Sequence, residues 1–205
     1  MRIGIFGGTF DPPHVGHLIL AGEAASQLKL ARLLWVLTPD PPHKLSKVVS
    51  PAEQRLELVK AEIEGEPAFE LSRVDLDRRG PHYAVDTLQL LAAAYPGDEL
   101  VYLMGGDSLR DLPTWYQPHA LLKVCALLGV MRRPQDKIDL AALEQGLPGI
   151  TQKVAFIDTP LVEISSADIR RRMAAGQPYR YFLTERVYQV IRAKNYYSSP
   201  RTQSW

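Results

Sequence analysis

The chain has 205 residues and a mass of 23.0 kDa, a length that suits one domain. Its 24 Lys and Arg residues nearly balance its 23 Asp and Glu residues, so no bulk attraction to nucleic acid or to an acidic membrane is expected. Cys125 is the one cysteine, which excludes an internal disulfide and a CxxC zinc motif and favours a cytoplasmic location. Neither a signal peptide nor a membrane-spanning stretch is predicted.

Strand and helix patterns alternate along the chain. Strands are predicted at residues 2–6, 33–37, 68–74, 99–104, 124–130 and 154–157. Helices are predicted at 15–30, at 51–64 after a capping box formed by Ser50 and Glu53, and at 84–94. This order predicts an α/β fold with a Rossmann-like, doubly wound and mostly parallel sheet that carries helices on both faces.

The last part of the chain has a different composition. Residues 163–205 carry 8 Lys or Arg and 3 Asp or Glu, whereas the first 162 residues carry 16 and 20. A small helical part is expected at about 163–194, within a single domain of residues 1–205, and a flexible tail at 195–205. The basic bias fits either a solvated helical surface or a phosphate-binding surface.

Several common ligand loops are absent. None of the 14 glycines is two positions from another, which excludes the G-x-G-x-x-G fingerprint of dinucleotide-binding dehydrogenases. The chain also has no Gly-Lys pair for a P-loop, no G-x-S-x-G and no H-E-x-x-H. A ligand must therefore be bound by another kind of loop.

The loop after the first predicted strand is a candidate phosphate site. It reads G-G-T-F-D-P-P-H-V-G-H over residues 7–17 and leads into the first helix. Glycines allow close backbone approach to a phosphate, and the helix N-terminus attracts anions. His14 and His17 share one face of that helix. They could also form a zinc pair, but the sequence offers no evident third ligand.

Three further segments complete the candidate site. In I-S-S-A-D-I-R, Ser165 or Ser166 caps a helix and Arg170 lies on the same face as Ser166, so both can meet an anion. G-G-D-S-L and L-P-T-W-Y follow the fourth strand, which should lie beside the first strand at the switch point of the sheet. The third segment is P-P-H-K, which offers His43 and Lys44 on a stiff loop.

The loop of residues 7–17 resembles the signature of the nucleotidylyltransferase superfamily, which is built around H-x-G-H. The order of G-G-T-F-D-P-x-H-x-G-H, P-P-H-K, Y-x-x-x-T-L, G-x-D-S-L-x-x-L-x-x-W-Y, R-R-P and I-S-S-x-x-x-R over residues 3–170 resembles the bacterial nicotinate-nucleotide adenylyltransferase family. This chain has Ala84 and Ala167 where that family often has Thr.

The resemblance implies an enzyme of NAD biosynthesis that transfers AMP from ATP to nicotinate mononucleotide. It implies catalytic roles for His14, His17, Lys44 and Arg170. The implied ATP site comprises Gly7, Gly8, Thr9, Phe10, His17, Gly105, Asp107, Ile164, Ser165, Ser166 and Arg170. The implied mononucleotide site comprises His43, Lys44, Tyr83, Ala84, Thr87, Trp115, Tyr116 and Arg133.

The same resemblance implies Mg²⁺ that arrives with ATP, with no metal ligands from the protein. The expected partners are ATP and nicotinate mononucleotide, with no nucleic acid, no membrane and a possible homo-oligomer. Other functions remain open: adenylyl transfer to nicotinamide mononucleotide or phosphopantetheine, a nucleotide-binding regulator without turnover, or an RNA-binding protein that uses the basic C-terminal part.

Overall fold

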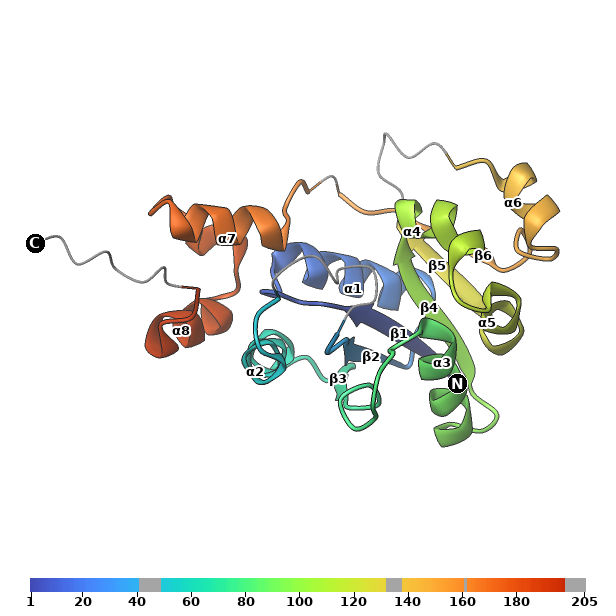
Figure 1. Cartoon of the computed structure of the whole chain (residues 1–205), viewed down its shortest axis with the longest axis horizontal. Coiled ribbons are helices and arrows are strands. Elements are labelled where there is room, and N and C mark those ends of the chain that lie inside the picture. The colour runs from blue at the N-terminus through green and yellow to red at the C-terminus, as the bar shows by residue number, and fades with distance from the viewer. Residues whose placement is uncertain (41–48, 132–137, 161, 198–205) are drawn as a thin grey trace, which may run out of the picture.

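The computed structural model describes residues 1–40, 49–131, 138–160 and 162–197. Its centre is a six-stranded sheet flanked by helices (Figure 1). The strands lie in the order β3-β2-β1-β4-β5-β6, and each neighbouring pair is parallel. Their bounds are β1 (Arg2–Gly8), β2 (Arg32–Leu37), β3 (Phe69–Ser72), β4 (Glu99–Gly105), β5 (Leu127–Met131) and β6 (Val154–Ile157). The predicted doubly wound sheet is confirmed, with β1 beside β4.

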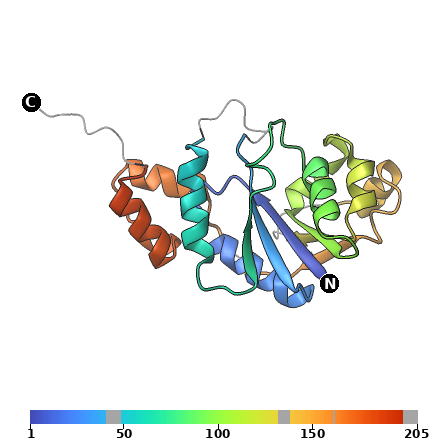
Figure 2. The same cartoon turned by 90° about the horizontal axis from the view of Figure 1, so that it is seen from below.

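Helices cover both faces of the sheet. One face carries α1 (Val15–Gln27) and α2 (Ala52–Ile63). The opposite face carries α3 (Ala84–Ala94), α4 (Gly106–Asp111), α5 (Pro118–Val124) and α6 (Leu140–Gly146), and Figure 2 shows the two layers on either side of the strands. Successive residues of each strand therefore point into two different apolar cores. Ile5 and its partner Leu34 point towards α3–α6, whereas Phe6 and its partner Trp35 point towards α1 and α2.

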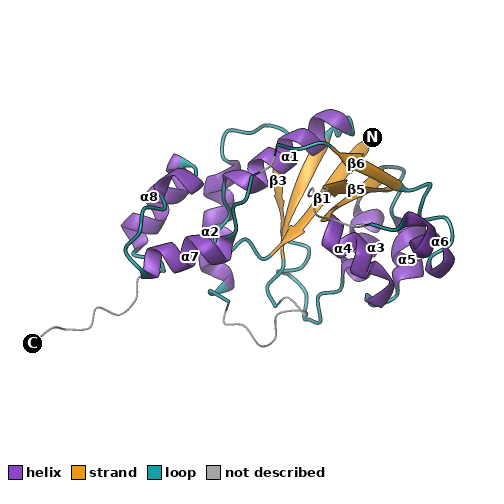
Figure 3. Cartoon of the chain, turned by 90° about the horizontal axis from the view of Figure 1, so that it is seen from above, coloured by secondary structure: helices purple, strands orange, loops and turns teal. Residues whose placement is uncertain are grey.

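The C-terminal helices α7 (Ser166–Ala174) and α8 (Glu185–Lys194) pack beside α2, away from the sheet (Figure 3). Leu58 of α2 meets Ile169, Val187 and Ile191 in a small separate core. Several basic side chains of this part pair with acidic side chains of α2 or its end. Arg186 lies 3.4 Å from Glu64, and Lys194 lies 3.8 Å from Glu57. Much of the basic bias is therefore balanced locally by neighbouring carboxylates.

Three details differ from the expected elements. The predicted cap at Ser50 is not formed: the N-cap of α2 is Pro51, which has no side-chain capping hydrogen bond, and the Ser50 backbone instead contacts Asp11 and Arg55. The short helices α4, α5 and α6 are missing from the expected elements. A Gly-Gly pair at the start of α4 is typical of a loop, and only the last residue of α5, Val124, falls within a predicted strand. That predicted strand spans 124–130, whereas β5 begins at Leu127.

The expected flexible tail also begins too early. Residues 195–197 form a turn, and the hydroxyls of Tyr196 and Tyr197 donate hydrogen bonds to Glu57 and Asp11. Side-chain hydrogen bonds to partners far along the chain leave no signal in local composition, which made these residues look like a frayed end. No helix among the described residues has both the length and the apolar character needed to cross a membrane.

Candidate active site

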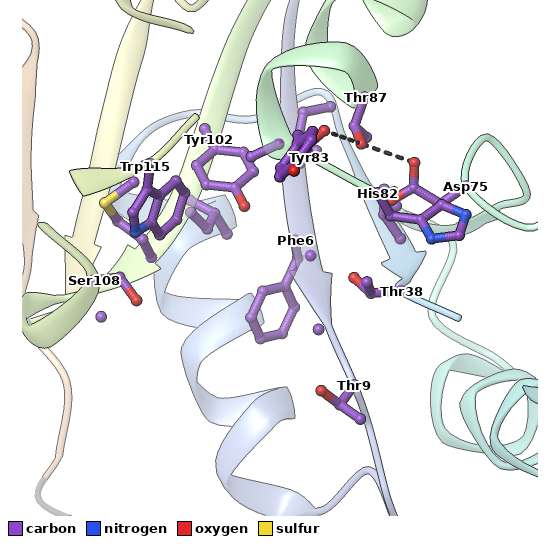
Figure 4. Close-up of a pocket in the computed structure, with 18 of the residues that line it drawn as sticks. Phe6, Thr9, Thr38, Asp75, His82, Tyr83, Thr87, Tyr102, Ser108 and Trp115 are labelled. Atoms are coloured by element: carbon purple, nitrogen blue, oxygen red, sulfur yellow. Dashed lines mark hydrogen bonds between the residues drawn. The ribbon is translucent and has the colours of Figure 1, made fainter. Parts of the chain in front are cut away.

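A cavity of about 900 Å³ opens at the carboxyl ends of the central strands. Gly8 and Thr9 line it from the end of β1, and Ser108 and Trp115 line it from the segment after β4 (Figure 4). The expectation that these two segments face one another is confirmed. Because β1 and β4 adjoin at the point where the strand order reverses, their loops diverge and leave a crevice between them.

The two histidines stack at the start of α1. Their ring centroids are 3.7 Å apart, and the backbone N–H of His14 donates to Nδ1 of His17 over 3.1 Å. A ring nitrogen that accepts a hydrogen bond carries no proton, so the neutral His17 ring holds its proton on Nε2. That N–H is a donor suited to a phosphate oxygen.

His14 is held as a neutral ring. Burial lowers its pKa to about 4, and its Nδ1 has no hydrogen-bond partner among the described residues. Gly16 leaves room for this ring, because a Cβ at this position would lie 3.1 Å from that nitrogen and the ring would have to shift by a few tenths of an ångström. The H-x-G-H spacing therefore serves to stack the two rings closely.

Phe10 supports His17 from beneath. Its side chain is only 2% exposed, its backbone φ is +48°, and its ring meets His17 edge-on at 5.1 Å. Phe6 and Trp35 complete this aromatic group. Because the Phe10 side chain is buried against this aromatic group, the part of Phe10 that can approach a ligand is its backbone.

The I-S-S motif lies against the loop between β1 and α1, as expected from sequence. Ser165 caps α7 by accepting the N–H of Asp168 over 3.1 Å, while the Ser166 hydroxyl donates to the Pro12 carbonyl over 2.8 Å. Arg170 donates to the Asp11 carbonyl, and its guanidinium lies 3.6 Å from the Asp11 carboxylate. The N-terminus of α7, Arg170 and the start of α1 therefore gather around one loop.

The other end of the crevice is aromatic. Tyr83, Ala84, Thr87, Trp115 and Tyr116 all line the cavity. The rings of Tyr83 and Tyr116 stack at 4.3 Å, and Ala84 is the first residue of α3. The first N–H groups of a helix have no acceptor within it, so the start of α3 offers backbone donors at this wall.

A buried polar cluster behind this wall was not expected from sequence. The Asp75 carboxylate, 3% exposed, accepts from Thr87 over 2.8 Å and from Arg78 over 3.0 Å. Arg78 also donates to the Pro81 carbonyl over 2.9 Å, and Thr87 donates to the Tyr83 carbonyl over 3.2 Å (Figure 4). The cluster fixes the backbone that leads into α3. An Asp three residues before an Arg is typical of an exposed ion pair, so local sequence patterns do not indicate that this carboxylate is buried.

Arg55 is a second residue that sequence patterns did not single out. It is 1% exposed, and its guanidinium donates to the carbonyls of Ser50, Thr9, Thr38 and Pro39 over 2.6–2.9 Å. Burial lowers its pKa, while the Asp11 carboxylate opposes that effect. Arg55 thereby joins the ends of β1 and β2 to the start of α2.

The remaining expected residues have varied positions. Gly7 and Gly105 line the cavity, and Ile164 lies beside Gly16. The exposed Asp107 accepts the N–H of Ser108 in the first turn of α4. His43, Lys44 and Arg133 lie outside the described residues. Within the described parts, no group of three His, Cys, Asp or Glu side chains could hold a metal ion.

Comparison with known proteins identifies the family. Residues 5–172 match the family described as cytidylyltransferase-like. A protein of Thermomicrobium roseum named probable nicotinate-nucleotide adenylyltransferase is 45% identical over 88% of this chain and 84% of its own. One of Dehalococcoides mccartyi with the same name is 37% identical over 96% and 97%. The chain belongs to the nicotinate-nucleotide adenylyltransferase family.

Solved structures agree on the fold. The Plasmodium falciparum nicotinic acid mononucleotide adenylyltransferase complexed with NaAD superposes with a TM-score of 0.75. The match covers 96% of this chain and 97% of that one at 19% identity. At this identity the likeness concerns the fold, and the close sequence relatives carry the family assignment.

Proposed function

We propose that this protein transfers the adenylyl group of ATP to nicotinate mononucleotide, producing deamido-NAD and pyrophosphate for NAD biosynthesis. One observation carries the proposal: the loop after β1 lines, at Gly8 and Thr9, the cavity whose aromatic wall lies at the start of α3. Beyond Thr9 the same loop contacts the start of α7 and leads into the two histidines of α1, which are the proposed phosphate-binding groups. A product with two nucleosides joined through phosphates needs these two kinds of surface side by side. Membership of the family supports the same reaction.

The chemistry requires positioning and charge stabilisation. A phosphate oxygen of the mononucleotide attacks the α-phosphorus of ATP, and the bond to the bridging oxygen breaks, so pyrophosphate leaves with the electron pair. The attacking oxygen is already an anion at neutral pH, so no general base is needed. His14 is compatible with a reaction that has no general base, because burial keeps its pKa far below neutrality and makes its ring a poor proton acceptor.

Each group of the phosphate end has a distinct part in this proposal. The Nε2–H of His17 donates to the α-phosphate, where charge develops in the transition state. The N-terminus of α7, with Ser165 and Ser166, and the guanidinium of Arg170 bind the β- and γ-phosphates. Mg²⁺ enters as part of the substrate Mg-ATP. His43, Lys44 and Arg133 are the candidates for guiding the acceptor phosphate or the leaving group.

Acceptor choice depends on the start of α3. The ring of Trp115 can stack on nicotinate and on nicotinamide alike, so it does not select between them. Backbone N–H groups near Ala84 and Tyr116 donate to a carboxylate, whereas a carboxamide NH₂ facing them would leave donor against donor. We expect nicotinate mononucleotide to be preferred by about 100-fold or more in kcat/KM, or roughly 2.7 kcal/mol.

The test is pyrophosphate release from Mg-ATP with each mononucleotide. The wild-type protein should turn over nicotinate mononucleotide, and Trp115→Ala should lower kcat/KM for both acceptors by similar factors. Equal wild-type kcat/KM values for the two acceptors would refute the nicotinate assignment, and no release with either would refute the enzyme. We also propose a cytoplasmic site of action, which is supported by a chain whose one cysteine, Cys125, is buried and forms no internal disulfide.

A further inference from the structure

Asp11 joins the loop between β1 and α1 to three distant parts of the chain. This loop, residues 9–14, is called the phosphate loop below. The Asp11 side chain is 4% exposed, and its carboxylate accepts the Ser50 N–H over 3.2 Å and the Tyr197 hydroxyl over 2.9 Å. The guanidinium of Arg170 lies 3.6 Å from the same carboxylate. Because Arg170 also donates to the Asp11 backbone carbonyl, Asp11 contacts the guanidinium through both its backbone and its carboxylate.

Tyr197 reaches Asp11 from the turn that follows α8. Tyr197 has a left-handed backbone with φ +61°, and the neighbouring Tyr196 anchors the turn by donating to Glu57 of α2 over 2.6 Å. Burial and the adjacent Asp11 carboxylate raise the pKa of Tyr197, so its hydroxyl keeps its proton and acts as a donor. The hydrogen bond spans 186 positions of sequence and connects the C-terminal part to the phosphate loop.

The Tyr197 hydroxyl contacts only one of the two carboxylate oxygens. It donates to Oδ1, which leaves Oδ2 for the Ser50 N–H and for the ion pair with Arg170. Without the hydroxyl, Asp11 loses a charge-assisted hydrogen bond, and its carboxylate can turn towards Arg170. A closer ion pair would hold the guanidinium on Asp11 and away from the phosphates of ATP.

We propose that Tyr197 is a positioning residue for ATP binding, acting through Asp11 on Arg170. This inference rests on the proposed function only in taking ATP as the ligand whose phosphates Arg170 binds. The proposed mononucleotide end of the crevice, at Trp115 and the start of α3, is built from other segments of the chain than those that these hydrogen bonds join. Loss of the Tyr197 hydroxyl should therefore weaken the binding of ATP and leave the binding of the acceptor unchanged.

The experiment compares Tyr197→Phe with Tyr196→Phe. Both variants keep the ring and remove one hydroxyl that donates to a carboxylate, and both residues lie in the same turn, so the pair is matched. The dissociation constant of Mg-ATP without acceptor is measured by calorimetry, together with KM for both substrates and the melting temperature. Tyr197→Phe should raise the ATP dissociation constant and KM about fivefold to tenfold, with less than about a twofold change for the mononucleotide.

The control and a double variant separate positioning from general stability. Tyr196→Phe should lower the melting temperature no more than Tyr197→Phe does, because Glu57 is more exposed than Asp11, and it should change the ATP constants by less than about twofold. In an Arg170→Lys background, Tyr197→Phe should add less than about twofold, because the two substitutions remove one shared interaction.

Two results would overturn the inference: an equal rise in the ATP constant in both tyrosine variants, or an equal rise in KM for both substrates in Tyr197→Phe. A wild-type protein that binds ATP with this dependence on Tyr197 but releases no pyrophosphate would refute the proposed function and leave the positioning role intact.

Discussion

Glu62 gives a prediction about how stability varies with pH. It lies on α2 and is 3% exposed; its Oε2 accepts the hydroxyl of Thr184, the N-cap of α8, over 2.7 Å. Its Oε1 has no partner among the described residues. Burial raises the pKa of this carboxyl from 4.5 to about 7, against the smaller opposing effect of the Thr184 hydrogen bond. At neutral pH, the contact that holds α8 on α2 therefore lies near its titration midpoint.

The size and sign of the effect follow from linkage. Between pH 4.5 and about 7 the folded protein holds a proton that the unfolded chain has released, so the free energy of unfolding falls as pH rises. Over this pH interval the free energy of unfolding falls by about 3 kcal/mol, at 1.36 kcal/mol per pH unit. His14 has the opposite effect, because burial lowers its pKa from 6.5 to about 4 and its contribution to stability is lost as pH falls through that range. The two slopes nearly cancel in the wild-type protein between pH 4.5 and 6.5.

The Glu62→Gln variant separates the pH effect of Glu62 from that of His14. The amide oxygen can still accept from Thr184, and any cost of burying the NH₂ is independent of pH. Urea unfolding of variant and wild type should show their difference growing by about 2–3 kcal/mol in favour of the variant between pH 5 and pH 8. Glu53→Gln, which changes an exposed carboxylate on the same helix, should give a flat difference. A flat difference for Glu62→Gln would refute the raised pKa and the reasoning from burial.

Three further predictions concern the crevice. His17→Ala should lower kcat by about 100-fold or more with an unchanged circular dichroism spectrum, the scale for losing one preorganised donor, and near-normal kcat would remove it from the phosphate site. Arg170→Ala should raise KM for ATP more than KM for the mononucleotide; equal effects on both would mean that α7 serves another role. Asp75→Asn should raise KM for the mononucleotide about fivefold with little change for ATP, because it loosens the backbone before Ala84. Asp77→Asn, in an exposed ion pair with Arg73, should change neither KM, and an equal response of the two variants would contradict the role of Asp75.

The parts of the fold that sequence predicts well depend on local patterns. The bounds of α3 and β6 agree residue for residue with expectation, because each is a single run of the appropriate period between clear turn signals. The strand order at the centre followed from the alternation of elements. The pairing of His14 and His17 at the start of α1 was also predictable, since residues three apart at a helix start share one face.

The parts that sequence did not predict depend on contacts between distant residues. Arg55 lies in a helix rich in charged residues, and nothing in its neighbours indicates that its guanidinium is buried against four carbonyls. Tyr197 and Asp11 are 186 positions apart. Local sequence patterns therefore predict neither the ordered turn that holds Tyr197 nor the hydrogen bonds of Asp11. Ser50 shows the converse, since a sound local capping signal is overridden by tertiary partners.

The two proposed ends of the site offer hydrogen-bond donors of different kinds. This difference determines which binding properties a side-chain substitution can change. At the start of α3 the donors are backbone N–H groups, which remain when a side chain is replaced, so Ala84 in place of Thr is compatible with binding a carboxylate. At the proposed phosphate end the proposed donors are the side chains of His17 and Arg170, which contact backbone groups of the loop before α1. We expect loss of one such contact to alter how ATP is bound and to leave the acceptor pocket intact. ATP affinity and acceptor selectivity should therefore vary independently among variants of this protein.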